Sequence, residues 1–354
     1  MTPGSLHDHG GATRPIRWGI VSAGGIANTV TADLQAMADG RAVAIASRDI
    51  GRARAFAERH GIERSYGSYA ELFADDDVDV VYVATPHRQH HAITRAALLA
   101  GKPALVEKAF TVTAAGAEDV IELARAQGLF VMEAMWTRFV PMIVHLCEII
   151  ADGTIGTIRS VRADLGSINE VDPRHRFWDL GQGGGAMLDL GVYPVAFAQM
   201  VLGDPTRVQA SGTVATTGVD AEIALLTAYA GDAHALLESS LVSALPGGAS
   251  VIGTTGRIHL LPRFHHTERL VLQRHGLDDV VIDAEGTLAT VGRGYTHELQ
   301  EVHDCLRAGR LESARMPWAD TLATMHTMES ALSLLDIHHT EDAGAMGDID
   351  VAIS

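Results

Sequence analysis

The chain has 354 residues, a formal net charge of −17 and 47% hydrophobic residues. Its length suggests about two domains with ordinary globular cores. The acidic balance argues against a nucleic-acid partner, which needs a basic face, and no uninterrupted apolar stretch approaches the ~18 residues of a membrane span. The two cysteines, Cys147 and Cys305, cannot build a disulfide framework and favour a reducing, cytoplasmic location.

The first third of the chain alternates strand and helix patterns. Residues 1–15 precede it, lack the apolar core of a signal peptide and are predicted to be a disordered tail. Strands are expected at Ile16–Val21, Ala42–Ala46, Val78–Ala84, Ala104–Val106 and Leu129–Met132. Helices are expected at Ile50–His60, His90–Ala100 and Thr113–Gln127. This alternation predicts a Rossmann-type, doubly wound parallel sheet over residues 16–136.

After a helix over Pro141–Ala151, the remaining chain reads as longer strands joined by short turns. The strand candidates are Ile158–Leu165, Val208–Ala215, Ala221–Tyr229, Ala233–Leu241 and Ala249–Thr254. Glycine-containing turns at 229–232 and 254–256 are typical of hairpins. Helices over Thr296–Arg310 and Ala319–Ile337 end the pattern. The fold class is therefore α/β, with a C-terminal α+β domain at 137–354 that contains a large, open, mostly antiparallel sheet.

The first strand and helix meet in a glycine-rich turn within Trp18–Ala27. Glycines there let the backbone approach a pyrophosphate at the helix N-terminus. Ser22 stands at the first glycine position of the dinucleotide fingerprint and Ala27 at the third, where a small residue suffices. The turn could be purely structural, but its place at the first βα junction favours a cofactor. The residues expected to bind it are Ser22, Gly24, Gly25, Ile26 and Ala27.

The second strand ends in Ser47, Arg48 and Asp49. An acidic residue directly at this strand end would bind the ribose of NAD. Here Ser47 and Arg48 come first, and a guanidinium pairs with the 2′-phosphate of NADP. The sequence therefore favours NADP, with NAD possible. In the alternative interpretation, Arg48 is solvated and Asp49 caps the next helix.

A further strand ends in Glu107 and Lys108. Ligands of open α/β sheets lie outside the carboxyl ends of the strands, so this pair is placed where chemistry would occur. Solvated charges at a strand end are the alternative. Neighbouring side chains of a strand point to opposite faces, which predicts that Glu107 faces away from Lys108.

Taken together, these motifs resemble the glucose-fructose oxidoreductase/inositol dehydrogenase (Gfo/Idh/MocA) family from Ile16 to about Ile337. The resemblance is carried by Trp18–Ala27, Ala84–His90, Glu107–Lys108, Glu133–Phe139 and Gly183–Pro194. Within the family, the chain is most similar to a subgroup of dihydrodiol dehydrogenases and NADP-dependent D-xylose dehydrogenases.

The resemblance implies a proton handler four residues after an aspartate on one helix, which fits Asp189 and Tyr193. A free tyrosine has a pKa of about 10, so we expect the Lys108 ammonium to lower it. Lys108 would also bind the substrate oxygen. Tyr193 could instead be a core aromatic, and Asp189 a charge at a helix start.

Other candidates lie around these residues. Thr85, Pro86, His87, His90, Glu107 and Lys108 are expected at the cofactor. Trp136, Arg138 and Phe139 are expected to cover the substrate and the nicotinamide. Packing between the domains is the alternative, since large aromatic side chains also serve that role. Arg176 and Phe177 could reach substrate. We expect no metal at His87, His90 and His91 because no carboxylate or cysteine completes a ligand set, and we interpret the pairs His265–His266 and His338–His339 as solvated.

The resemblance implies an NAD(P)-dependent oxidoreductase that moves hydride between the cofactor and a secondary alcohol of a sugar, polyol or cyclic diol. Substrate specificity is expected from loops around 166–182 and 262–296. The alternatives are a non-enzymatic nucleotide-sensing regulator of the same fold and an NAD-dependent glycoside-cleaving enzyme. The resemblance also implies a homodimer or homotetramer formed through the C-terminal sheet.

Overall fold

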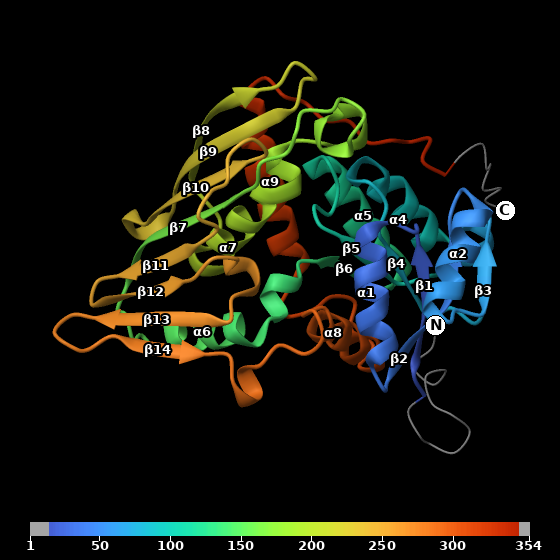
Figure 1. Cartoon of the computed structure of the whole chain (residues 1–354), viewed down its shortest axis with the longest axis horizontal. Helices are drawn as coiled ribbons and strands as arrows, with labels where there is room; N and C mark the ends of the chain where they lie inside the picture. The colour runs from blue at the N-terminus through green and yellow to red at the C-terminus, as the bar shows by residue number, and fades with distance from the viewer. Residues whose placement is uncertain (1–13, 347–354) are drawn as a thin grey trace.

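The computed structural model describes residues 14–346, which form two β-sheets with helices between and around them (Figure 1). The first sheet is parallel, and its strands in spatial order are β3 (Arg64–Tyr66), β2 (Gly40–Ala46), β1 (Ile16–Val21), β4 (Val80–Val83), β5 (Ala104–Glu107) and β6 (Val131–Ala134). Its helices are α1 (Gly25–Ala36), α2 (Ile50–His60), α3 (Tyr69–Phe73), α4 (His90–Leu99) and α5 (Ala114–Gln127). The strand order reverses between β1 and β4, which opens a crevice at the carboxyl ends of the strands.

The second sheet has eight strands. In spatial order they are β14 (Val280–Asp283), β13 (Arg269–Arg274), β12 (Gly256–Leu260), β11 (Ala249–Gly253), β7 (Ile158–Gly166), β10 (His234–Ser240), β9 (Asp220–Ala228) and β8 (Arg207–Val214). β7 and β10 run parallel, and the other neighbours run antiparallel. The helices α6 (Pro141–Ala151), α7 (Val192–Leu202) and α9 (Trp318–Ser333) pack on one face of this sheet.

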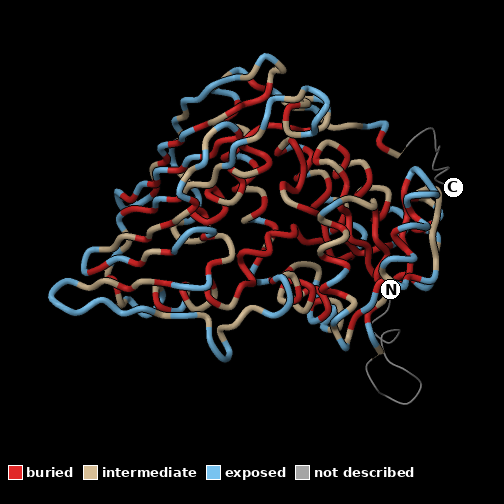
Figure 2. The backbone as a smooth tube through the Cα atoms, viewed as in Figure 1, coloured by how far each residue is buried: buried red, intermediate tan, exposed pale blue. Residues whose placement is uncertain are grey.

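Figure 2 shows that the buried segments lie in the first sheet and between the two sheets, while the outer turns of the second sheet are exposed. In β9 and β10, buried and exposed side chains alternate, as expected for a sheet covered on one face only. One stretch, Leu180–Leu202, is long and apolar enough to cross a membrane, which corrects the expectation that none approaches that length. Because 72% of its apolar window is buried, it is a core segment of this fold.

The predicted alternation is confirmed, and Ile16–Val21, Ile50–His60 and Pro141–Ala151 have the expected bounds. The interpretation of 262–296 as a loop is wrong, because β13 and β14 lie in it. Both strands are short, and β14 is an exposed edge strand. Because few of its side chains are buried, its sequence lacks the alternation of apolar and polar residues that marks a strand. The elements β12, β3 and α3 were not predicted from the sequence either, and each has five residues or fewer.

The division into residues 16–136 and 137–354 stays a prediction. Helix α8 (Thr296–Arg307), although late in the chain, packs against α1 of the first half. Trp18 Nε1 in β1 lies 2.9 Å from His303 Nε2 on this helix, and Arg307 pairs with Asp39 at 2.8 Å. The C-terminal third of the chain therefore returns to the first sheet.

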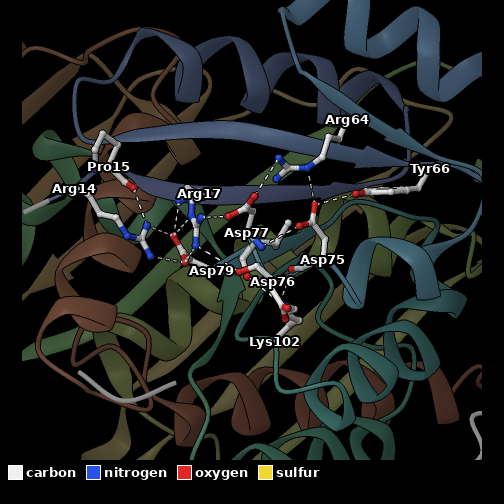
Figure 3. A network of polar contacts seen from close by, with 11 residues as sticks. Arg14, Pro15, Arg17, Arg64, Tyr66, Asp75, Asp76, Asp77, Asp79 and Lys102 are labelled. Carbon is white, nitrogen blue, oxygen red and sulfur yellow. Dashed lines mark hydrogen bonds and ion pairs between the residues drawn. The ribbon is translucent and has the colours of Figure 1, made fainter. Parts of the chain in front are cut away.

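A network of charged residues holds the amino ends of β1 and β4 (Figure 3). Asp79, whose side chain is 1% exposed, accepts from the Arg14 guanidinium at 2.8 Å and from the Arg17 amide at 2.9 Å. Lys102 caps the neighbouring turn by donating to the carbonyl of Val78 at 3.0 Å. Residues 1–13 of the expected tail lie outside the described residues, but Arg14, also placed in that tail, is held by this network.

The network predicts a pH-dependent stability. Burial disfavours the charged carboxylate, but the bonds from Arg14 and Arg17 hold the pKa of Asp79 below its ordinary value. The ionised group therefore stabilises the fold above the unfolded pKa of about 3.9, and this contribution is lost as the pH falls through the folded value. Asp79→Asn should lower the free energy of unfolding by about 3 kcal/mol at pH 7, measured by urea denaturation, because it removes the buried negative charge to which Arg14 and Arg17 both donate.

The difference between wild type and Asp79→Asn should shrink below about pH 4. Asp77→Asn is the matched control, since Asp77 is 59% exposed in the same network and should lose less than about 1 kcal/mol. An equal loss at pH 7 and at pH 3 would contradict the ionic origin of the effect.

Candidate active site

A cleft of about 840 Å³ lies at the carboxyl ends of the first sheet, on the side that faces the second sheet. It contains most of the residues expected from sequence. These are Ser22, Gly24, Gly25, Ile26, Ser47, Arg48, Thr85, Pro86, His87, Glu107, Lys108, Trp136, Arg176, Asp189 and Tyr193. The side chains that sequence reasoning missed include Arg52, Tyr69, Gln89, Leu165, Gln182, Leu190, His265 and Tyr295.

The glycine-rich turn forms one end of the cleft. Ser22 has φ +87°, a conformation that favours glycine, which explains why the fingerprint has glycine there. Gly24 caps α1 without a side-chain hydrogen bond, so the first N–H groups of the helix have no side-chain partner. A Cβ on Gly25 would meet nothing within 4 Å. An open approach to an uncapped helix N-terminus fits a pyrophosphate, so these residues fit a dinucleotide.

Two arginines lie beyond the end of β2. Arg48 is exposed and, with Arg52, lies beside Tyr69, whose pKa is raised by burial and lowered in part by both guanidinium groups. Asp49 lines the cleft, but its Oδ1 accepts from the amides of Gly51 at 2.8 Å and Arg52 at 3.2 Å. Its carboxylate is therefore engaged as the N-cap of α2, as the alternative interpretation proposed.

Two histidines connect the strand ends. His87 begins the short helix η2 (His87–Gln89), and its ring nitrogens lie 2.9 Å from the carbonyl of Gly183 and 3.1 Å from that of Lys108. Burial, with the nearby positive charge of Lys108, lowers the pKa of His87, so the ring is neutral. His90 lies 2.8 Å from the carbonyl of Thr85 and 2.9 Å from that of Ala109.

His90 therefore joins the segments that follow β4 and β5. It does not line the cleft, so the expectation that it contacts the cofactor is wrong. His91 pairs with Asp119 at 2.7 Å. Within residues 14–346, no group of three or more His, Cys, Asp or Glu side chains could hold a metal ion.

Glu107 and Lys108 both line the cleft, so the expectation that Glu107 points away is wrong. The strand ends at Glu107, and strict alternation does not continue past it. Glu107 accepts from the hydroxyl of Tyr82 and from the amide of Lys108 at 3.2 Å, while burial raises its pKa. The Lys108 ammonium donates to the carbonyl of Asp189 at 2.7 Å and lies 4.8 Å from the centroid of the Tyr193 ring.

Asp189 lies in the π-helical turn η6 (Met187–Gly191), which continues into α7. Its Oδ1 accepts from Arg176 at 2.8 Å. Burial opposes ionisation, but the charges of Lys108 and Arg176 hold the pKa of Asp189 below its ordinary value. Single π-helical turns inside α-helices are frequent at functional sites.

Steric contacts explain why glycine is required before this turn. Gly185 has φ +117°, and a Cβ there would lie 2.1 Å from Oδ1 of Asp220. Asp220, buried on β9, accepts from the amide of Met187 at 2.6 Å and so holds the start of the π-helical turn. No local pattern points to Asp220, because it lies on a strand 33 residues after its partner Met187.

The Tyr193 side chain packs among the aromatic and imidazole side chains that line this part of the cleft. Trp136 Nε1 donates to the Tyr193 hydroxyl at 3.1 Å, and Tyr295 stacks on Trp136 with 4.6 Å between centroids. The prediction that Lys108 lowers the pKa of Tyr193 is wrong. Burial and the negative charge of Glu107 raise the pKa of Tyr193, and the bond from Trp136 offsets only part of this. Lys108 lies over the ring face and donates to a carbonyl instead of the hydroxyl.

His265 and Tyr295 come from the segment that sequence reasoning treated as a loop. His265 lies 4.8 Å from the Tyr193 ring, its Nδ1 is buried without a partner, and burial lowers its pKa to about 3. The interpretation of His265–His266 as a solvated pair is therefore wrong. Asp33 on α1 positions Tyr295 by accepting from the amides of Arg293 at 2.9 Å and Tyr295 at 3.1 Å.

Four other expected site residues lie outside the cleft. Arg138, expected at the cofactor, is buried in the helix η3 (Trp136–Phe139), where it pairs with Asp320 and donates to Gln199. Phe139 lies in the same short helix and faces a separate groove near α6. A turn of 3₁₀-helix points successive side chains in different directions, so Trp136 alone reaches the cleft. Ala27 is buried within α1, and Phe177 packs beside the Arg176 guanidinium, 4.4 Å from it.

Comparison with known proteins agrees with this architecture. Residues 16–135 match the oxidoreductase family with a NAD-binding Rossmann fold, and residues 143–259 match the Gfo/Idh/MocA C-terminal domain. The chain is 38% identical to trans-1,2-dihydrobenzene-1,2-diol dehydrogenase of Macaca fuscata fuscata, over 92% of this chain and 99% of that protein. Its identity to the Homo sapiens enzyme of the same name is 37% over the same shares.

Solved structures show the same fold. A 3-ketoreductase from Actinomadura kijaniata, in complex with NADP and TDP-benzene, is 27% identical with a TM-score of 0.78, over 90% of this chain and 98% of that one. An aldose–aldose oxidoreductase from Caulobacter crescentus has a TM-score of 0.82 at 22% identity, over 91% of this chain and 98% of that one. With both sheets, the dinucleotide turn and the matches over most of its length in agreement, this chain belongs to the Gfo/Idh/MocA family of oxidoreductases.

Proposed function

We propose that this protein transfers hydride between NADP and a secondary alcohol of a sugar, polyol or cyclic diol, or the corresponding ketone. The observation that carries the proposal is the convergence of Lys108, Asp189 and Tyr193 in the cleft that also contains the dinucleotide turn. An ammonium, a carboxylate and a phenol around one space are the groups that a reaction at a hydroxyl requires.

Ser22, Gly24 and Gly25 would hold the pyrophosphate and Arg48 the 2′-phosphate, and the bound nicotinamide supplies or accepts the hydride. Tyr193 handles the proton of the substrate oxygen. Its raised pKa keeps it a neutral phenol, the form that donates a proton to a ketone oxygen during reduction. The bond from Trp136 occupies a lone pair of the phenol oxygen and leaves its proton free for the substrate.

Lys108 stabilises the negative charge that develops on the tyrosine oxygen or the substrate oxygen. Asp189 balances the lysine charge and, through Arg176, holds the loop next to it. In the reverse direction, the tyrosinate form of Tyr193, stabilised by the Lys108 ammonium, takes up the hydroxyl proton as the alcohol is oxidised.

The relatives support the substrate class. The dehydrogenases at 37–38% identity are named for a cyclic trans-diol, and the ketoreductase at 27% identity contains NADP. A nucleotide-sensing regulator needs no proton relay beside its cofactor, so the convergence of Lys108 and Tyr193 disfavours it. An NAD-dependent glycoside-cleaving enzyme should retain its cofactor through purification, which absorbance would detect.

Cofactor choice can be tested at Arg48. Arg48→Ala should raise the Michaelis constant for NADP about tenfold or more, through loss of a charge-assisted bond worth ~1.5–3 kcal/mol, and should leave NAD kinetics nearly unchanged. Steady-state kinetics with both cofactors measures this. The matched control is Arg54→Ala, an exposed arginine on the following helix α2 that does not line the cleft. An equal effect of Arg48→Ala on both cofactors would contradict the assignment.

The proton relay can be tested with Tyr193→Phe, Lys108→Met and the double variant. Each single change should lower turnover ~10²–10⁴-fold. The two losses should be non-additive because the residues act as a unit. Turnover is measured with a panel of aldoses, inositols and cyclic diols, and cofactor affinity separately by fluorescence. Cofactor affinity should survive in Tyr193→Phe, which keeps the ring. Near-wild-type turnover in this variant would show that the tyrosine is only a core residue.

We also propose that two copies pair through the open face of the second sheet, as a dimer or within a tetramer. Leu226 and Leu236 are cross-strand neighbours on that face and are 41% and 42% exposed. Pairing would remove this apolar surface from water. Light scattering at micromolar concentration should give at least twice the chain mass of 37.6 kDa, and Leu226→Asp with Leu236→Asp should reduce it. A monomeric mass for the unsubstituted protein would refute the proposal.

A further inference from the structure

Arg88 joins three segments that are far apart in the sequence. It lies on η2 between His87 and Gln89, which both line the cleft, but it does not line the cleft itself. Its Nη1 donates to the carbonyl of Gly181 at 3.2 Å. Its Nε and Nη2 donate to the carbonyl and hydroxyl of Thr340 at 2.7 and 3.1 Å. One planar guanidinium thus bonds both the loop before the glycines and the C-terminal part of the chain.

The C-terminal segment 340–342 is anchored beyond its contact with this side chain. The amide of Asp342 donates to the Arg88 carbonyl at 2.9 Å. Oε1 of Glu341 accepts from the amide and hydroxyl of Thr113, at 3.0 and 2.8 Å, and from the amide of Val112 at 3.2 Å. Because Thr113 is the N-cap of α5, the segment is fixed to the start of that helix.

The loop at 176–183 carries two cleft-lining side chains, and its apolar anchor is Trp178, which is fully buried against Ala186, Val219 and Leu241. Arg176, bonded to Asp189, and Gln182 line the cleft, whereas Gly181 is exposed. The loop meets η2 closely, since a Cβ on Gly183 would lie 2.9 Å from the Cβ of His87. Trp178 anchors the middle of the loop, whereas the exposed turn at Gly181 depends on polar contacts such as the one from Arg88 for its position.

We propose that Arg88 is a positioning residue that holds the loop 176–183 against the cofactor half of the cleft, with segment 340–342 as its outer support. The proposal rests on the proposed function, because Arg176 and Gln182 of this loop line the cleft in which the substrate would bind. Arg88 contacts neither the cleft nor the reacting groups, so its loss should affect substrate binding more than turnover. Small displacements of positioning groups lower catalytic efficiency because the bound geometry is no longer productive.

The test compares Arg88→Ala, Arg88→Lys, Glu341→Ala and Glu341→Gln with the unsubstituted chain. Hydrogen–deuterium exchange of the peptide 176–183, measured without substrate, should rise about fivefold or more in Arg88→Ala. Exchange around the dinucleotide turn at 22–28 should stay unchanged. The KM for the alcohol should rise about five- to tenfold, with kcat and the Kd for NADPH within about twofold.

The conservative variants test whether the lost hydrogen bonds cause the effect. Arg88→Lys keeps one donor and should restore part of the protection, while Glu341→Gln keeps an acceptor oxygen and should perturb the loop less than Glu341→Ala. Arg95→Ala is the matched control, because Arg95 on α4 donates to Asp119 on α5 and does not line the cleft, so its loss should change neither exchange nor KM.

Unchanged exchange of 176–183 in folded Arg88→Ala would overturn the proposal. So would a uniform rise in exchange across the chain, which would mark Arg88 as a residue of general stability. Failure of the unsubstituted protein to turn over any alcohol would instead contradict the proposed function, because the exchange of the loop is measured without activity.

Discussion

The hydrogen bond from the Lys108 ammonium to the Asp189 carbonyl joins the two halves of the cleft. Lys108 follows the last residue of β5 in the first sheet, and Asp189 lies in the π-helical turn that leads into the helix under the second sheet. Each half alone is incomplete: the first offers a dinucleotide turn and a cation, the second a carboxylate and a phenol. This contact, together with those of His87 with Gly183 and of Trp136 with Tyr193, fixes the distance between the two sets of groups.

Burial and the charges in the cleft explain the state of the Tyr193 phenol. Burial raises the pKa of Tyr193, the nearby carboxylates of Glu107 and Asp189 raise it further, and the Lys108 ammonium donates its hydrogen bond to a carbonyl and not to the phenol. The phenol is therefore protonated, and its oxygen is oriented by Trp136. The balance of two buried carboxylates against Lys108 and Arg176 keeps the site close to neutral, which lowers the cost of burying each charge.

Around this centre, positioning is done by backbone contacts more than by side-chain pairs. Asp33 holds the turn that presents Tyr295, Asp220 holds the start of the π-helical turn, and Arg88 joins the loop at 176–183 to the C-terminal segment. Each of these side chains is polar, removed from the reacting groups, and bonded to backbone amides or carbonyls of another element. Such contacts make the site rigid without placing further charge in the cleft.

The sequence by itself determined the parallel α/β order and the dinucleotide turn, because local periodicity and short motifs record these features. The grouping of Lys108 with Asp189 and Tyr193 was implied by the resemblance to a known family, since no local pattern distinguishes Tyr193 from a core aromatic. Ser22 could be placed at a glycine position from spacing alone, and its φ of +87° agrees. Local signals could not reveal that His265 and Tyr295 reach Tyr193, or that Arg138 and Phe139 turn away from it. Those facts depend on contacts between residues more than fifty positions apart, and only the tertiary structure decides which of several polar or aromatic side chains on a loop faces the cleft. The same holds for the pKa of Tyr193, which follows from the burial and the charges that folding gathers around it.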